Sequence, residues 1–154
     1  MLLIALFACA GDLDPDALHW EVTVVGLEDG CHADGETVAY REDFTYAVYF
    51  DGSSTTLKID GDTFATGVLS GCTITYESVE TREDRGDGFV RWKLEGEALA
   101  QQEGASCGIE PDEDGVQLDW QGTESFTLLE TDLAGYELPC SYGMSVEGTF
   151  LPTE

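Results

Sequence analysis

Apolar and polar residues alternate along most of the chain from residue 19 onward, which is the pattern of half-buried β-strands. The alternating runs are separated by clusters of Gly, Asp, Ser and Pro, which favour turns. No window shows the period of an amphipathic helix. The pattern predicts eight strands, over residues 19–26, 43–50, 55–60, 62–69, 72–78, 89–100, 116–129 and 140–150.

The connections between these strands predict their relative direction. Asp51-Gly52 and Asp60-Gly61 each place a glycine where a tight hairpin turn needs positive φ. Neighbouring strands are therefore expected to be antiparallel. Longer loops, which hold most of the clustered acidic residues, are expected over residues 27–42, 79–88, 101–115 and 130–139.

The face opposite the apolar one carries charged residues, among them Glu21, Lys93 and Glu147. A wet exterior around an apolar interior is the reverse of a transmembrane barrel. Eight antiparallel strands in sequence favour an all-β fold, an eight-stranded antiparallel up-and-down barrel, because closure removes exposed strand edges. The alternative is a two-sheet β-sandwich. The expected barrel resembles the lipocalins in shape alone, because the chain has no lipocalin sequence motif.

Large aromatic residues occupy most inward positions of the expected barrel. The interior of an eight-stranded barrel is only wide enough for side chains to fill it. A packed aromatic core is therefore expected, and a small apolar ligand in the barrel mouth is the alternative. The inward aromatic residues are Trp20, Phe44, Tyr46, Phe50, Phe64, Tyr76, Trp92, Trp120, Phe126, Tyr142 and Phe150.

The first residues of the chain have the pattern of a processing signal. Residues 1–8 form an uncharged apolar run that is too short to span a bilayer as a helix. The run leads into Leu6-Phe7-Ala8-Cys9, which resembles the lipobox of bacterial lipoproteins. The resemblance implies that signal peptidase II removes the run as a signal peptide and that Cys9 carries a lipid. Ala10 after the cysteine points to the outer membrane, and the alternative is a buried first strand that contains a cysteine.

The charge of the chain bears on how it could reach a membrane. Lys and Arg number 6 against 32 Asp and Glu, so the net charge is −26, yet 42% of the residues are hydrophobic. Such a chain folds, and its charge disfavours binding to nucleic acid or to an anionic membrane surface. We expect residues 9–17 to be a lipidated acidic tether and residues 18–154 to be one monomeric β domain, held at the membrane by lipid rather than by charge.

Four cysteines remain when Cys9 is set aside, and they are widely spaced. An even number in a chain that resembles an exported one predicts two disulfides, whereas structural zinc needs closely spaced ligand pairs. In an up-and-down barrel Cys31 and Cys140 fall at the same end of the adjacent first and last strands, and Cys72 and Cys107 share the opposite end. We therefore predict the disulfides Cys31–Cys140 and Cys72–Cys107.

The sequence offers little catalytic or metal-binding chemistry. The two histidines, His19 and His32, lie outside any nucleophile motif and are expected to be surface or loop residues, so no catalytic residue and no enzymatic activity are predicted. Glu110, Asp112 and Asp114 have the spacing of the first ligands of a calcium loop, but the residue at the twelfth loop position is Gln. Solvated acidic loops are the favoured interpretation of this spacing, so no cofactor is expected.

Together these patterns predict a lipid-anchored lipoprotein of the bacterial cell envelope with a non-catalytic, structural or interaction role. The alternative is a binding module, either for Ca²⁺ through the acidic loops or for a small apolar ligand in the barrel mouth. The tripeptide Arg85-Gly86-Asp87 is expected to be only a turn.

Replacing Cys9 with Ser tests the anchor. Because a serine cannot receive the lipid, the variant should leave the membrane fraction and appear in the soluble fraction of lysed cells. The measurement is immunoblotting of fractionated cells, with Ala10→Ser as the matched control that keeps the lipidated cysteine. Unchanged membrane association of the Cys9→Ser protein would contradict the prediction.

Overall fold

The computed structural model describes residues 13–31, 40–99 and 119–152, and within these ranges it is built from β-strands without helices. The strands are β1 (Leu18–Asp29), β2 (Arg41–Asp51), β3 (Ser54–Ile59), β4 (Asp62–Ser70), β5 (Thr73–Glu77), β6 (Thr81–Arg85), β7 (Gly88–Leu99), β8 (Asp119–Thr131) and β9 (Cys140–Leu151). In the described part of the chain, no helix is long and apolar enough to cross a membrane.

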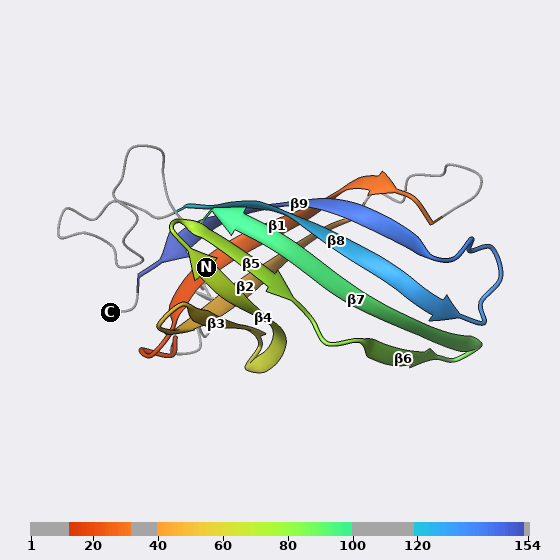
Figure 1. Cartoon of the computed structure of the whole chain (residues 1–154), viewed down its shortest axis with the longest axis horizontal. Coiled ribbons are helices and arrows are strands. Elements are labelled where there is room, and N and C mark those ends of the chain that lie inside the picture. Colours follow the sequence, from red (N-terminus) through yellow and green to blue (C-terminus); the bar gives the residue numbers. More distant parts are fainter. Residues whose placement is uncertain (1–12, 32–39, 100–118, 153–154) are drawn as a thin grey trace, which may run out of the picture.

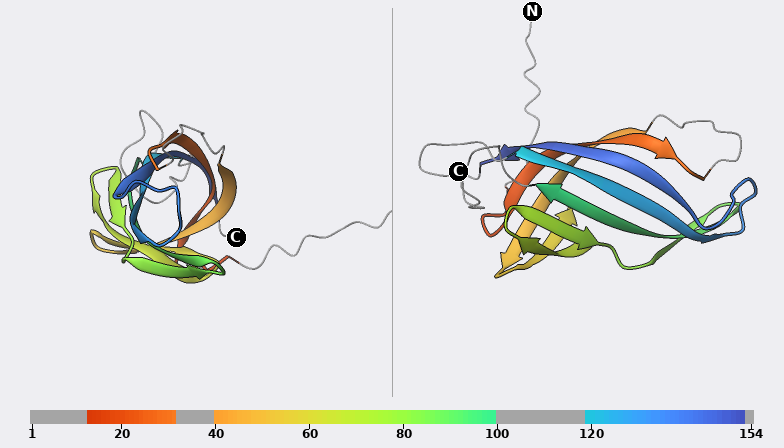
Figure 2. Two further views of the ribbon diagram at one scale, coloured as in Figure 1. Left: turned by 90° about the vertical axis from the view of Figure 1, so that its right-hand side faces the viewer. Right: turned by 45° about the horizontal axis from the view of Figure 1, so that its top comes forward.

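Eight of these strands close into a barrel. Consecutive strands from β1 to β5 and from β7 to β9 pair antiparallel, β5 pairs with β7, and β1 pairs with β9 along most of its length. A view along the barrel shows the strands arranged as a ring (Figure 2). The predicted eight-stranded up-and-down barrel is therefore confirmed, and the sandwich alternative does not form because the first and last strands pair with each other.

The structure contains one strand that the alternation did not predict. β6 lies within the expected loop 79–88 and pairs with the first half of β7, whereas β5 pairs with the second half. β5 and β6 therefore follow one another along β7 (Figure 1). At the break between them, the Ser78 hydroxyl accepts a hydrogen bond from Leu94 N–H, at 2.9 Å. The pattern missed β6 because Thr81–Arg85 contains no apolar residue, which suits a strand at a sheet edge.

The barrel wall is interrupted on one side. β3 pairs with β2 only as far as Tyr46 opposite Ile59, so the first five residues of β2 pair only with β1 among the described residues. β6 likewise pairs only with β7 within the described ranges. We call the gap between Arg41–Thr45 of β2 and Thr81–Arg85 of β6 the side opening. There, each of the two strand segments has a pairing partner on one side only among the described residues.

The main hydrophobic core fills the other end of the barrel. Trp20 and Trp120 are fully buried with ring centroids 5.3 Å apart, and Phe150 packs edge-on against Trp20 at 5.6 Å. Gly148 lies between Val22 and Trp120 in the sheet, and a side chain there would collide with both. Large rings on β1 and β8 are thus accommodated by a small residue on β9, and the predicted aromatic core is confirmed at this end.

A second, smaller core surrounds a disulfide at the opposite end. Cys31 and Cys140 are bonded to each other, as predicted, and are buried with Val90 and Leu128. Cys72 is also part of a disulfide. Cys107 lies outside the described residues, so the Cys72–Cys107 pairing stays a prediction.

Removing the Cys31–Cys140 disulfide should destabilise the barrel strongly. The bridge joins residues 109 positions apart, and closing a loop of that size restricts the unfolded chain enough to stabilise the fold by about 2–5 kcal/mol. We expect the Cys31→Ala, Cys140→Ala double variant to lose free energy of unfolding in that range in urea titrations. An unchanged urea midpoint would show that the bridge contributes nothing to stability.

Candidate functional site

A carboxyl group lies inside the barrel. Glu124 occupies an inward position of β8, between Trp120 and Phe126 in the alternation, and only 4% of its surface is exposed. Its neighbours in the sheet are Gly96 on β7 and Met144 on β9. Burying a carboxyl group costs free energy unless other groups hydrogen-bond to it. The partners of Glu124 therefore decide what this part of the interior can do.

Two tyrosines hold the Glu124 carboxyl group from other walls of the barrel. The Tyr46 hydroxyl on β2 donates to Glu124 Oε1 at 3.0 Å, and the Tyr76 hydroxyl on β5 donates to the same oxygen at 2.7 Å. Both tyrosines are buried. Three strands that are distant in the barrel are thus connected through one oxygen atom, and both donors are neutral groups.

Gly96 makes the contact between Tyr76 and Glu124 possible. It stands between them, paired with Tyr76 on one side and with Glu124 on the other. A Cβ atom at this position would overlap the ring of Tyr76. The ring therefore lies across the backbone of β7, and any side chain larger than hydrogen at position 96 would displace it.

Burial dominates the ionisation of this cluster. It raises the pKa of Glu124 above 4.5, while the hydrogen bonds from Tyr76 and Tyr46 act in the opposite direction. Burial and the charge of Glu124 also raise the pKa of both tyrosines. Trp120, whose indole nitrogen is buried beside the cluster, opposes the rise for Tyr76.

A second tyrosine–carboxylate pair lies at the same level of the barrel. Tyr40 accepts a backbone hydrogen bond from Gly26, which pairs with Met144, the neighbour of Glu124. The Tyr40 hydroxyl donates to Glu42 Oε2 at 2.7 Å, and Glu42 is exposed at an inward position of β2. The pKa of Tyr40 is raised, and burial is the largest cause. The hydrogen bond to Glu42 and the charge of Glu42 come next, and the charge of Glu124 contributes least. Both carboxyl groups therefore act on the same hydroxyl.

Aromatic rings from three adjacent strands continue the inner surface beyond Glu124. Trp92 on β7 stacks on Phe126 of β8, with ring centroids 4.7 Å apart, and Tyr142 of β9 meets Phe126 edge-on at 6.1 Å. The Trp92 indole N–H donates to Glu83 of β6 at 3.0 Å. These rings lie at the level of the side opening, because Trp92 pairs with Thr81 of β6.

The exposure of these inward side chains differs from that of the main core. Trp20 and Trp120 are fully buried, whereas five inward side chains near the side opening are partly buried, as Phe50 and Phe64 are elsewhere in the barrel. We call this partly buried set the aromatic mouth. It consists of Phe44, Trp92, Leu94, Phe126 and Tyr142. The aromatic mouth is the candidate functional site.

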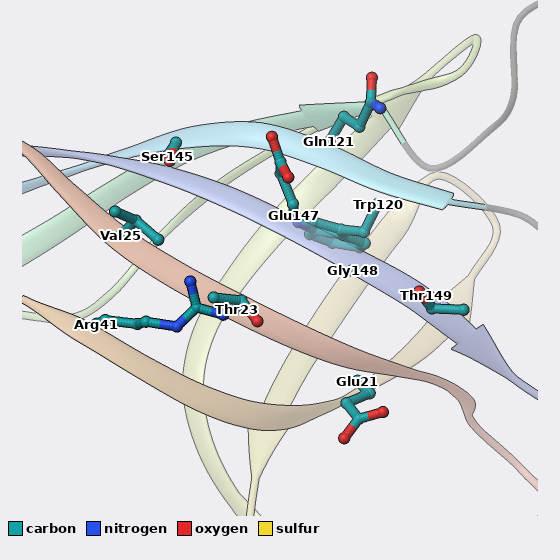
Figure 3. A pocket seen from close by; sticks show the side chains of 10 residues that line it. All are labelled: Glu21, Thr23, Val25, Arg41, Trp120, Gln121, Ser145, Glu147, Gly148 and Thr149. Carbon is teal, nitrogen blue, oxygen red and sulfur yellow. The ribbon is translucent and has the colours of Figure 1, made fainter.

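A hollow lies on the outer face of the barrel, away from the aromatic mouth (Figure 3). It has a volume of about 530 Å³ and is lined mainly by outward-facing side chains of β1 and β9. Its charged side chains, Glu21, Arg41 and Glu147, are exposed to solvent. A smaller hollow of about 240 Å³ adjoins it beside Asp43. Neither hollow contains a buried ionisable group or a histidine, so we give them no chemical role.

Several of the residues singled out in the sequence lie outside the described part of the chain. They are Cys9, His32, Cys107, Glu110, Asp112 and Asp114. The lipid anchor therefore stays a prediction, and so does the interpretation of the acidic residues as a solvated loop rather than a calcium site. Among the described residues, no group of three or more His, Cys, Asp or Glu side chains is placed to hold a metal ion.

His19 is not the surface or loop residue that was expected. It belongs to β1 and is buried beneath a turn, where its Nε2 donates to the backbone oxygen of Asp14 at 2.9 Å. The Asp14 carboxylate also accepts a hydrogen bond from Tyr49, at 2.7 Å, which ties the turn to β2. The structure thus gives His19 a structural position. Arg85-Gly86-Asp87 forms the turn between β6 and β7, as expected.

Sequence reasoning missed Glu124 altogether. A usable signal was present, because Trp120, Glu124 and Phe126 share one face of an alternating strand, and an acidic residue on an inward face needs a partner inside. Gly96 gave a similar signal on the neighbouring strand. Both were overlooked because the acidic residues of this chain are so numerous that none stands out.

Comparison of the chain with known protein families, curated protein sequences and solved structures found no match. The function must therefore be argued from the geometry described above.

Replacing Glu124 with Gln should change how stability depends on pH. The folded-state pKa of Glu124 is raised. Below about pH 4 the carboxyl group is neutral in both the folded and the unfolded chain, so burying it carries no cost of ionisation. As the pH rises toward the folded-state pKa, the unfolded chain ionises more readily, and the wild type loses stability. Gln cannot ionise but still accepts from the tyrosines. The free energy of unfolding of the variant, relative to that of the wild type, should therefore increase with pH, by about 1.4 kcal/mol for each pH unit by which the pKa is raised.

The measurement is urea unfolding of both proteins between pH 4 and 8. Glu147→Gln, on the outer face of β9, is the control for removing a charge from an already acidic chain. A difference between Glu124→Gln and wild type that stays constant over this range would mean that Glu124 titrates like a surface residue.

Proposed function

We propose that this protein is a lipid-anchored, non-catalytic binding protein of the bacterial cell envelope, with the aromatic mouth as its ligand site. The observation that carries the proposal is the contrast in burial inside one barrel. Trp20 and Trp120 are fully enclosed, whereas Trp92 and Phe126 also face inward and remain partly exposed. Inward aromatic rings that stay partly exposed occur in ligand sites, which are lined mainly by apolar and aromatic side chains.

The chemistry around the aromatic mouth suits binding better than catalysis. The described polar groups nearest to it are carboxyl groups and the polar ends of aromatic rings, and each carboxyl group is already held by a hydroxyl or an indole N–H. No described histidine or cysteine thiol lies among them to act as a base or a nucleophile. We therefore assign these carboxyl groups and rings to orienting a ligand rather than to converting it.

The anchor in this proposal rests on the lipobox-like Leu6-Phe7-Ala8-Cys9. A net charge of −26 opposes adsorption to anionic headgroups, so a covalent lipid is the attachment that this chain could use. Residence in an oxidising compartment fits the disulfide between Cys31 and Cys140.

Ligand entry can be tested with the neutral dye Nile red and with acrylamide quenching. Trp92 is the partly exposed one of the three tryptophans, so it should account for most of the quenching, and saturating dye should protect it. Phe126→Ala removes the ring that stacks on Trp92 and should weaken dye binding about tenfold or more. Fluorescence titration gives both quantities.

Val68→Ser is the matched control, because Val68 is an exposed apolar residue on β4, away from the mouth. It should leave dye binding unchanged. Dye binding that does not saturate, or that Phe126→Ala and Val68→Ser change equally, would contradict a site in the aromatic mouth and favour a purely structural role.

A further inference from the structure

The segment that precedes β1 is fixed to the barrel at Asp14. The backbone oxygen of Asp14 accepts hydrogen bonds from His19 Nε2 at 2.9 Å and from Ala17 N–H at 3.2 Å. The Asp14 carboxylate accepts from Asp16 N–H at 2.9 Å and from the Tyr49 hydroxyl of β2 at 2.7 Å. Ala17 and His19 are buried. The chain is therefore attached to the barrel from Asp14 onward, before β1 begins.

This attachment lies at one end of the barrel. Tyr49 is two residues from the end of β2, next to the turn at residues 51–54. The turn at residues 70–73 adjoins it, because the backbone oxygen of Ser53 accepts a hydrogen bond from Leu69 N–H at 2.7 Å. We call the part of the barrel that carries these two turns the near end.

The aromatic mouth lies toward the opposite end of the barrel. That end, which we call the far end, carries the turn at residues 86–87 and the connection at residues 132–139 (Figure 1). Tyr142 of the mouth pairs with Asp29, the last residue of β1, and with Phe126. Because β1 has 12 residues, about 40 Å of strand separates its two ends.

The attachment at Asp14 limits how far the barrel can move from a lipid on Cys9. Asp14 is five residues from Cys9, a distance that a fully extended chain covers with about 17 Å. If the chain met the barrel only at Leu18, nine residues would separate it from Cys9, and the reach would be about 31 Å. The hydrogen bonds of Asp14 therefore shorten the reach of the anchor by nearly half.

The charge of the chain acts on the orientation that this short reach allows. With a net charge of −26, a barrel wall that lies on an anionic bilayer is repelled by it. At physiological salt the repulsion extends about 8 Å, which is less than the reach of about 17 Å from Cys9 to Asp14. The wall is thus kept off the bilayer while the near end stays within reach of the anchor.

From this arrangement we infer that the near end faces the anchoring membrane and that the aromatic mouth faces away from it. The mouth then takes its ligand from the aqueous phase rather than from the bilayer. The inference rests on the proposed function, because it needs the lipid on Cys9, and it specifies the side from which the ligand arrives.

The experiment measures which end of the barrel lies closer to the lipid headgroups. The full-length lipidated protein, labelled with ¹⁵N-glycine, is placed in nanodiscs of phosphatidylcholine and phosphatidylglycerol that contain a lipid with a gadolinium chelate on its headgroup. Exposed turns supply a glycine pair at each end, Gly52 and Gly71 at the near end and Gly86 and Gly135 at the far end. Relative to nanodiscs with the diamagnetic lutetium chelate, the near-end amide signals should lose intensity while the far-end signals keep theirs.

Two variants serve as controls. Cys9→Ser lacks the lipid, so none of the four glycine signals should lose intensity. A flexible Gly/Ser insertion of about twenty residues between Gly11 and Asp12 adds about 25 Å of reach, and it should reduce the intensity loss at the near end. Acrylamide should quench Trp92 equally in the nanodisc-bound protein and in the Cys9→Ser protein, because the mouth stays open to water.

Mass spectrometry of the protein purified from membranes separates failure of the inference from failure of the proposed function. A lipidated protein whose far-end signals lose as much intensity as the near-end signals, or more, would overturn the inference and leave the anchor standing. Protection of Trp92 by the nanodisc would also overturn it, because the mouth would then open toward the bilayer. A Cys9 without lipid would overturn the anchor of the proposed function together with the inference.

Discussion

The antiparallel pairing of β1 with β9 joins the two ends of the meander and defines an inside. Every other assignment in the molecule depends on this closure, because side chains alternate across a strand and acquire an inner or an outer environment only when the sheet closes. It brings Cys31 next to Cys140 and Trp20 next to Phe150. It also leaves the acidic residues of the outer face in solvent, where their mutual repulsion is screened.

Within that enclosure the Glu124 cluster marks a boundary. On one side Trp20 and Trp120 are fully buried, and on the other the rings of the aromatic mouth are partly exposed. Gly96 allows Tyr76 to lie across β7 and reach the carboxyl group, so a polar network connects β2, β5 and β8 at the point where the wall becomes incomplete. The same feature therefore contributes to cohesion of the barrel and places a polar group beside the site.

Much of the fold followed from local pattern. The alternation predicted the eight barrel strands, the Asp-Gly turns predicted the antiparallel meander, and that topology predicted the Cys31–Cys140 bridge. The alternation did not predict β6, because an exposed edge strand needs no apolar face. The candidate site was much less predictable. The mouth rings were expected to face inward, but Tyr40 and Glu42 fell in or beside an expected loop, and Glu124 was one acid among 32.

The sequence by itself determined the strand pattern, the wet exterior, the aromatic interior and the geometry that joins Cys31 to Cys140, because each follows from alternation and from strand order. Only the tertiary structure decided which acid is buried, which rings stay partly open and where the wall is interrupted. Those outcomes depend on how far each strand pairs with its neighbour, as where β3 stops opposite Tyr46, and on contacts between residues far apart in the chain, such as Tyr46 and Glu124. A local pattern carries no information about distances across a closed barrel.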